Sequence, residues 1–138
     1  MEIRINQEIE LPQAATEILK LAGNERIFLF QGEMGAGKTT LIKSICLKLG
    51  MTEMVSSPTY SIVNEYIYPG GKIYHFDFFR IKSQAEALDI GFEEYLSSGD
   101  YCFIEWPENI SDLWPLHFIE IKMEEQENGI RVISATRL

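Results

Sequence analysis

Apolar residues along the chain follow two spacings, one typical of strands and one typical of helices. The runs Ile27–Phe30 and Tyr101–Ile104 are apolar throughout, as expected for strands that are covered on both faces of a sheet. Apolar residues recur at helical spacing in Leu11–Ala22 and Lys38–Leu49, and each segment is followed by a glycine that can end a helix. The pattern therefore predicts buried strands that alternate with amphipathic helices.

A hairpin is predicted after the second of these helices. Tyr60–Tyr68 and Lys72–Asp77 have the character of strands and flank the turn signal Pro69-Gly70-Gly71. The other predicted elements are strands over residues 2–5, 116–123 and 130–133 and short helices over residues 83–89 and 92–96. Together they predict an α/β fold of three layers, whose mixed sheet has a parallel core with antiparallel hairpin additions.

Length and cysteine content narrow the class of protein. The 138 residues are close to the usual size of one domain, so residues 1–138 are expected to form a single domain. The N-terminus lacks the features of a signal peptide, and no apolar run has the length needed to cross a bilayer. Cys46 and Cys102 lie in apolar segments and are expected to be buried thiols. These features predict a cytoplasmic protein that does not associate with a membrane.

The net charge of −9 limits the kinds of partner that the protein binds directly. An acidic surface repels a phosphate backbone, and the chain has no cluster of lysine or arginine. Direct binding of nucleic acid is therefore disfavoured, whereas contact with RNA through a partner protein remains open.

A phosphate-binding motif, G-x-x-x-x-G-K-T, follows the first buried strand and begins the second helix. A glycine-rich turn at this place directs backbone N–H groups toward phosphate oxygens. Lys38 is placed to reach the β- and γ-phosphates of a nucleotide, and the Thr39 hydroxyl is placed to bind Mg²⁺. The candidate binding residues of the loop are Glu33, Met34, Gly35, Ala36, Gly37, Lys38, Thr39 and Thr40.

A phosphate loop needs a carboxylate at the end of a neighbouring strand, and two strands offer one. Asp77 ends one predicted strand and is expected to hold a metal-bound water. Glu105 ends the other and is expected to orient or deprotonate the attacking water. Both acids, with Thr39, are candidate metal ligands. The alternative is that one of them only ends its strand.

Four further residues have more than one interpretation from the sequence. Thr59 lies in a polar loop, where its hydroxyl can sense the γ-phosphate or have no function. His75 is more often a packed or hydrogen-bonded histidine than a catalytic base. Arg80 lies near phosphate or forms a surface salt bridge. Trp106 flanks the nucleotide or only packs.

The set of motifs is more specific than any one of them. They occupy Gly32–Thr40, Ser57–Tyr60, His75–Arg80, Gly91–Glu94 and Ile104–Glu108, in this order. This series closely resembles the TsaE family, also known as the YjeE/YdiB family of small bacterial P-loop ATPases. The residues after Glu108 carry no motif of the family that can be aligned.

The resemblance implies a P-loop NTPase fold and an ATPase that is needed to make tRNA N6-threonylcarbamoyladenosine (t6A37). Proteins of this family use ATP and Mg²⁺ and work with the TsaB and TsaD proteins, so tRNA is reached only indirectly. The resemblance implies that Thr59 is a switch-like threonine, Asp77 the metal-side acid and Glu105 the acid near the hydrolytic water. Lys38 remains the phosphate contact, and Trp106 becomes a neighbour of the active site.

Two other functions use the same loop. A small-molecule kinase usually carries a lid of arginines over the phosphates, and Arg80 is the only arginine between Arg26 and Arg131. A nucleotide-gated binding module needs occupancy of the loop rather than hydrolysis. The chain lacks the N-K-x-D stretch that reads guanine, which favours ATP.

Overall fold

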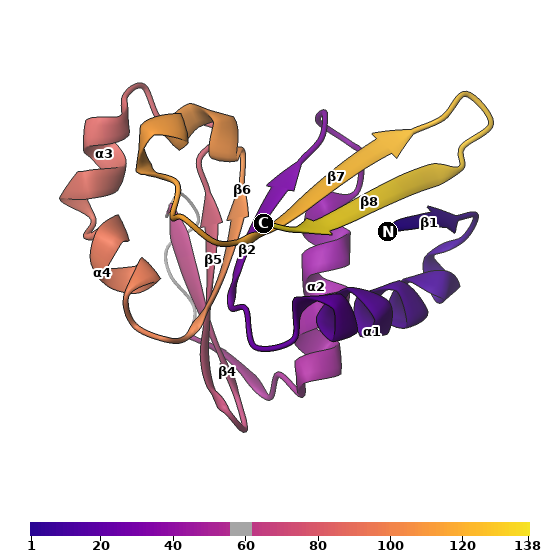
Figure 1. The fold of residues 1–138 in the computed structure, drawn as a ribbon, viewed down its shortest axis with the longest axis horizontal. Helices are drawn as coiled ribbons and strands as arrows, with labels where there is room; N and C mark the ends of the chain where they lie inside the picture. Colours follow the sequence, from indigo (N-terminus) through magenta and orange to yellow (C-terminus); the bar gives the residue numbers. More distant parts are fainter. Residues whose placement is uncertain (56–61) are drawn as a thin grey trace.

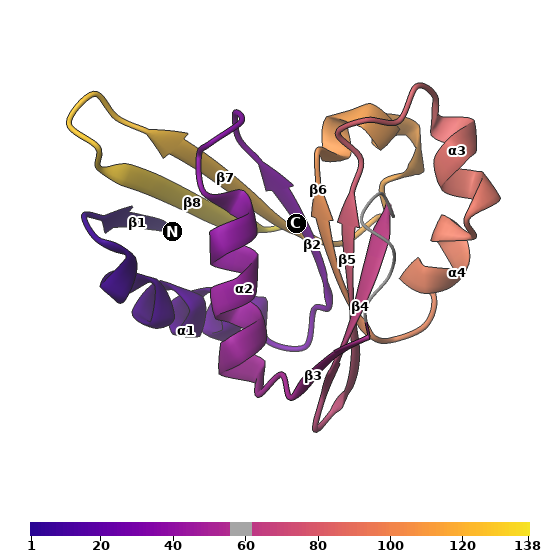
Figure 2. The same ribbon diagram turned by 180° about the vertical axis from the view of Figure 1, so that it is seen from behind.

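A computed structural model describes residues 1–55 and 62–138. Its eight strands form one sheet, and helices cover both faces of this sheet (Figures 1 and 2). In chain order the elements are β1 (Glu2–Ile5), η1 (Glu8–Glu10), α1 (Leu11–Ala22), β2 (Ile27–Gln31), α2 (Lys38–Leu49), β3 (Glu53–Val55), β4 (Val63–Tyr68), β5 (Gly71–Asp77), α3 (Gln84–Asp89), α4 (Phe92–Leu96), β6 (Tyr101–Glu105), η2 (Pro107–Leu113), β7 (Ile119–Glu125) and β8 (Arg131–Arg137).

The sheet has the order β1-β8-β7-β2-β6-β5-β4-β3. Strand β2 pairs in parallel with β7 and β6, and β6 pairs in parallel with β5. The strands outside this core pair antiparallel at both edges. The predicted α/β fold, with a parallel core and antiparallel hairpins, is therefore confirmed.

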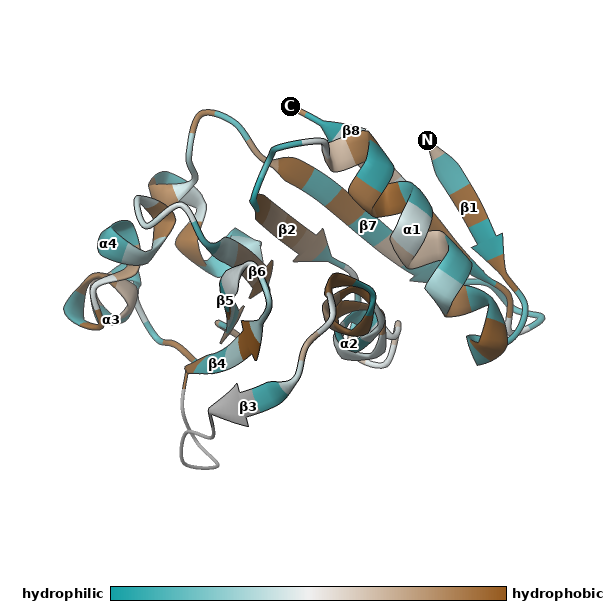
Figure 3. Ribbon diagram, turned by 90° about the horizontal axis from the view of Figure 1, so that it is seen from below, coloured by the Kyte–Doolittle hydropathy of each residue, from teal (hydrophilic) through white to brown (hydrophobic). Residues whose placement is uncertain are grey.

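Alternating side chains of the central strands build a separate core on each face of the sheet. Phe28, Phe30 and Phe103 face α1 and α2, whereas Leu29 and Ile104 face α3, α4 and η2. Figure 3 shows the two groups of helices on opposite sides of the sheet and the apolar character of β2. Because each central strand is buried on both faces, its sequence is apolar throughout, as predicted.

The predicted elements differ from the structure mainly at their ends. The predicted strand over 116–123 begins only at Ile119, where β7 meets β2, and Leu116 is exposed. Strand β8 extends to Arg137, beyond the predicted end at residue 133. The short strand β3 was not predicted, and residues 60–61 of the predicted hairpin lie outside the described residues.

Two simpler expectations can also be compared with the structure. Cys46 and Cys102 are free and buried, as predicted. Within residues 1–55 and 62–138, no helix is both long and apolar enough to cross a membrane.

Candidate active site

The phosphate loop connects the carboxyl end of β2 to the first residue of α2. Gly32 lies so close to β7 that a Cβ atom there would come within 2.7 Å of the Met123 carbonyl oxygen. Gly37 precedes α2 with φ +100°, a left-handed conformation that side chains rarely adopt. The sequence therefore needs glycine at both places for the loop to turn from the sheet into the helix. The amino end of α2, which favours anions, begins at this turn.

Lys38 is buried at the base of the loop, with a relative exposure of 5%. Its Nζ donates a hydrogen bond to the Gly32 carbonyl oxygen and lies 3.6 Å from the centroid of the Trp106 ring. Burial lowers the pKa of Lys38, and the negative charges of Glu105, Glu108 and Asp77 partly oppose this effect. A cation that lacks water in this way gains most from an anionic ligand, so the side chain is suited to bind phosphate.

Glu105 contacts the hydroxyl that was predicted to bind metal. The Thr39 Oγ1 atom lies 3.0 Å from each carboxylate oxygen of Glu105, to which the hydroxyl donates. Glu105 ends β6 and has a relative exposure of only 4%. The parallel register of β2 and β6 brings this acid beside the first turn of α2. Two residues 66 positions apart thus form one polar centre.

His75 and Tyr66 extend this polar centre into the protein. His75 Nε2 lies 2.6 Å from Glu105 Oε2, and Tyr66 Oη lies 3.1 Å from His75 Nδ1. Because a carboxylate only accepts, the His75 Nε2–H donates to Glu105, and Nδ1 on the other side of the ring bonds to the Tyr66 hydroxyl. Burial above all, and then the charges of Cys46 and Glu105, raise the pKa of Tyr66 and keep it a hydroxyl donor.

Sequence reasoning correctly identified His75 as a packed, hydrogen-bonded histidine but missed its contact with Glu105. Tyr66 was not considered at all. The two residues face each other diagonally across the antiparallel pair β4 and β5, and the parallel pair β5 and β6 places His75 near Glu105. The signals in the sequence were the histidine inside the mainly apolar segment 73–76 and its place at the start of the motif His75–Arg80.

Asp77 lies next to Glu105 in the register of β5 and β6, so both acids end neighbouring strands as predicted. Asp77 is exposed, and its Oδ1 accepts the Phe79 N–H at 3.0 Å. Its charge acts on Lys38 but Asp77 has no hydrogen bond to Thr39 among the described residues. The buried acid Glu105, rather than Asp77, therefore touches the candidate metal-binding hydroxyl.

The available donors fit a hard, oxygen-preferring cation. Thr39, Glu105 and Asp77 offer only hydroxyl and carboxylate oxygens, which Mg²⁺ prefers. The described part of the chain has no group of three or more His, Cys, Asp or Glu residues that could hold a metal by itself. Mg²⁺ commonly binds through one or two carboxylates with substrate phosphates and water, so these residues fit the ion.

Trp106 has the left-handed backbone angles φ 57° and ψ 49°, which are unusual for a residue other than glycine. This conformation turns the chain directly after Glu105. The indole ring lies over Lys38 and beside the Phe79 ring, with centroids 5.0 Å apart. Backbone strain of this kind occurs often at functional sites. Trp106 therefore lies beside Lys38, the first residue of α2 after the loop.

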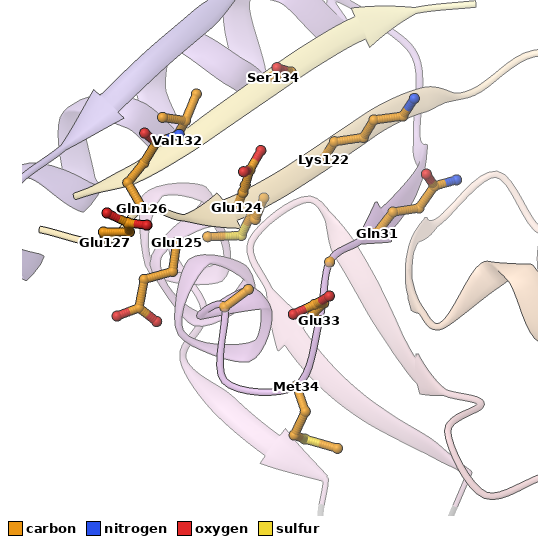
Figure 4. A pocket seen from close by; sticks show the side chains of 13 residues that line it. Gln31, Glu33, Met34, Lys122, Glu124, Glu125, Gln126, Glu127, Val132 and Ser134 are labelled. Carbon is orange, nitrogen blue, oxygen red and sulfur yellow. The ribbon is translucent and has the colours of Figure 1, made fainter. Parts of the chain in front are cut away.

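A groove of about 830 Å³ lies on the other side of the loop, against β7 and β8 (Figure 4). Its lining includes four carboxylates, from Glu33, Glu124, Glu125 and Glu127. Negative walls are unfavourable for phosphate, although Gln31 and Lys122 also border the groove. Phosphate groups are therefore expected beside Lys38 and Thr39 and not in this groove.

The remaining predicted site residues lie outside the cluster formed by Lys38, Thr39 and Glu105. Glu33, Met34 and Gly35 form the exposed tip of the loop, where they can contribute backbone N–H groups, and Ala36 is buried behind it. Arg80 is exposed and forms no ion pair with any described residue, so the alternative of a surface salt bridge finds no support in that part of the chain. Thr59 lies outside the described residues.

The sequence of this chain matches a model of a known protein family over most of its length. The family model described as "Threonylcarbamoyl adenosine biosynthesis protein TsaE" matches residues 5–133. The chain belongs to the TsaE family. The resemblance to TsaE that the sequence motifs indicated is therefore confirmed.

Several TsaE proteins are similar over most of their length. The chain is 34% identical to tRNA threonylcarbamoyladenosine biosynthesis protein TsaE of Haemophilus influenzae over 124 residues, which cover 88% of this chain and 78% of the relative. It is 35% identical to the TsaE protein of Rickettsia typhi over 134 residues, 94% of this chain and 90% of the relative.

A solved structure of the family has the same fold. The crystal structure of YdiB from Bacillus subtilis matches with a TM-score of 0.74 and 25% sequence identity. The match covers 99% of this chain and 84% of YdiB. The P-loop NTPase fold implied by the resemblance is therefore confirmed for the whole architecture.

Proposed function

We propose that this protein binds ATP with Mg²⁺ and hydrolyses it, and that the cycle supports t6A37 formation together with TsaB and TsaD. One observation supports the proposed hydrolysis above all others. The Thr39 Oγ1 atom lies 3.0 Å from each carboxylate oxygen of Glu105. This contact joins the phosphate loop to a buried acid at the end of the adjacent parallel strand. The names of the relatives support the tRNA modification part.

The residues of the site divide the chemistry among them. Lys38 and the amino end of α2 bind the phosphates and offset their charge. Thr39, with Glu105 and Asp77, would hold Mg²⁺, which when bound would neutralise charge that develops on the phosphates. Glu105 accepts hydrogen bonds from Thr39 and His75 beside the phosphate loop, which supports a role next to the terminal phosphate. A carboxylate held in this way can orient that water or accept its proton.

The buried pair of His75 and Glu105 keeps the acid in one orientation. Glu105 receives hydrogen bonds from Thr39 and His75, so its rotation is restricted. A fixed acid reduces the reorganisation that hydrolysis requires. We expect hydrolysis by the protein alone to be slow, because none of the described hydrogen bonds to Glu105 comes from an arginine.

The acidic charge of the chain supports action through proteins. With a net charge of −9, the protein is poorly suited to bind tRNA by itself. We therefore propose that TsaB and TsaD provide the contact with tRNA and that the protein acts in the cytoplasm, where tRNA is modified.

The test compares ATP binding and hydrolysis by the wild type with those of three variants. Lys38→Ala should abolish tight ATP binding, and Glu105→Gln should bind ATP but lose hydrolysis. Glu8→Gln is the matched control, because Glu8 is an exposed acid whose charge is not among those that act on Lys38. Hydrolysis by Glu105→Gln at the wild-type rate would refute the proposed role of Glu105. Transfer of the γ-phosphate to a metabolite instead of water would favour a kinase.

A further inference from the structure

The first residue of β8, Arg131, lies against the phosphate loop. If Gly37 carried a Cβ atom, that atom would lie 3.3 Å from both Cζ and Nη1 of Arg131. The guanidinium group therefore packs directly against the side of Gly37 from which a side chain is missing. This contact joins the last strand of the chain to the turn that begins α2.

The guanidinium group of Arg131 has no polar partner in the part of the chain that the structure describes. Its Nε atom is buried and makes no hydrogen bond. Glu125 lies opposite Arg131 in the antiparallel register of β7 and β8, but no ion pair joins the two residues. An arginine that is partly buried without an acceptor is unfavourable, because its charged donors lose water without replacement.

A second arginine on β8, Arg137, has the hydrogen-bond acceptor that the guanidinium group of Arg131 lacks. Arg137 ends β8 and lies on the same face of the strand as Arg131. It also packs against a glycine, Gly23, but its Nη2 donates to Asn24 Oδ1 at 3.1 Å. The protein thus provides an acceptor for Arg137, whereas Arg131 lies beside the phosphate loop with none.

The order of the sheet determines which phosphate Arg131 can reach. Strand β8 lies beyond β7 on one side of β2, and β6, which ends in Glu105, lies on the other side. Arg131 and Glu105 therefore approach the loop from opposite sides. If the terminal phosphate of a nucleotide lies beside Glu105, the phosphate next to the nucleoside lies toward Arg131.

We propose that Arg131 binds the phosphate of ATP or ADP that is attached to the nucleoside. This proposal rests on the proposed binding of ATP at the loop. Guanidinium groups bind phosphate oxygens through several donors at once, and this binding would supply the acceptor that Arg131 lacks. Arg131 would thus be a nucleotide-binding residue that lies outside the motifs of the loop.

The test measures the affinities of the wild type and of Arg131→Ala, Arg131→Gln, Arg131→Lys and Arg137→Ala for ATP, ADP and inorganic tripolyphosphate by calorimetry. Arg131→Ala and Arg131→Gln should both bind all three ligands about tenfold or more weakly, since a hydrogen bond to a charged group has this effect. Arg131→Lys should recover part of the loss, and Arg137→Ala should bind as the wild type does. Thermal unfolding of each variant without ligand confirms that it is folded.

The outcomes separate this proposal from the proposed function. Unchanged affinity of both folded Arg131 variants would refute the proposal while leaving ATP binding intact. A loss confined to ATP would place Arg131 at the terminal phosphate, and a loss for ATP and ADP but not tripolyphosphate would place it on the nucleoside; either result would overturn the proposal. Absence of ATP binding by the wild type would instead refute the proposed function.

Discussion

The imidazole of His75 donates from Nε2 to Glu105 Oε2 across 2.6 Å, in a part of the protein where both side chains are almost fully buried. Tyr66 bonds to the other ring nitrogen. The chain of Tyr66, His75, Glu105 and Thr39 thus connects the interior of the sheet to the phosphate loop. Glu105 is held by Thr39 from helix α2 and by His75 from strand β5, and Tyr66 of strand β4 holds His75 in turn.

Replacing His75 by alanine should reduce kcat for ATP hydrolysis by roughly 10- to 100-fold, the usual effect of removing a group that orients a catalytic ligand. The KM for ATP should change little, because His75 does not contact the phosphate loop. Tyr66→Phe is the matched milder change, since it removes only the hydroxyl, and should have a smaller effect. Steady-state kinetics of both variants provide the measurement. A His75→Ala variant that is folded and fully active would contradict the role of His75.

Trp106 should report the binding of ATP. Its ring lies 3.6 Å from the Lys38 ammonium group, and that group is expected to move toward the phosphates when ATP binds. Addition of ATP should therefore change the tryptophan emission of the wild type. Trp114, whose Nε1 donates to the Pro107 carbonyl oxygen at 2.8 Å, packs away from the loop and serves as the control. Trp114→Phe should keep the ATP-dependent change and Trp106→Phe should lose it; the reverse pattern would contradict the assignment.

Replacing Thr39 by valine should raise the Mg²⁺ concentration needed for half-maximal hydrolysis by about tenfold or more. Valine has a similar shape but lacks the hydroxyl that donates to Glu105 and is proposed to bind the metal. Thr39→Ser restores the hydroxyl and should restore most of the Mg²⁺ affinity. Titration of hydrolysis with Mg²⁺ measures both effects, and an unchanged Mg²⁺ requirement in Thr39→Val would count against Thr39 as a metal ligand.

The thiols of Cys46 and Cys102 should be unreactive in the folded protein. Burial raises the pKa of each thiol to about 12. Both groups therefore remain protonated at pH 8, and the thiolate, which is the reactive form, is scarce. Alkylation with iodoacetamide, followed by mass spectrometry, should be slow without denaturant and fast in guanidinium chloride. Rapid labelling of either cysteine in the native protein would show that its surroundings open.

The sequence predicted those features that depend on neighbouring residues. The apolar runs of β2 and β6 showed that both strands are buried, and the acid that follows Ile104 could be placed at the end of a strand. The phosphate loop was recognisable because its glycines and Lys38 lie at fixed spacing. Each of these predictions depends on a few consecutive residues, so the sequence of the segment itself was sufficient.

The contacts between distant strands could not be predicted in the same way. The contact between His75 and Glu105 depends on the order and register of β5 and β6, which the pattern of either strand does not determine. Arg131 reaches the loop from β8, almost a hundred residues after it, and no motif marks that position. The late start of β7 at Ile119 likewise depends on pairing with β2 and not on the apolar character of Leu116.

The most direct test of the proposed function measures the rate of ATP hydrolysis with and without purified TsaB and TsaD. We predict slow hydrolysis by the protein alone, clear stimulation when both partners are added, and loss of the stimulated rate in Glu105→Gln. The Glu8→Gln control should be stimulated as the wild type is. An identical rate with and without the two partners, together with normal t6A37 in cells that lack this protein, would contradict the proposal.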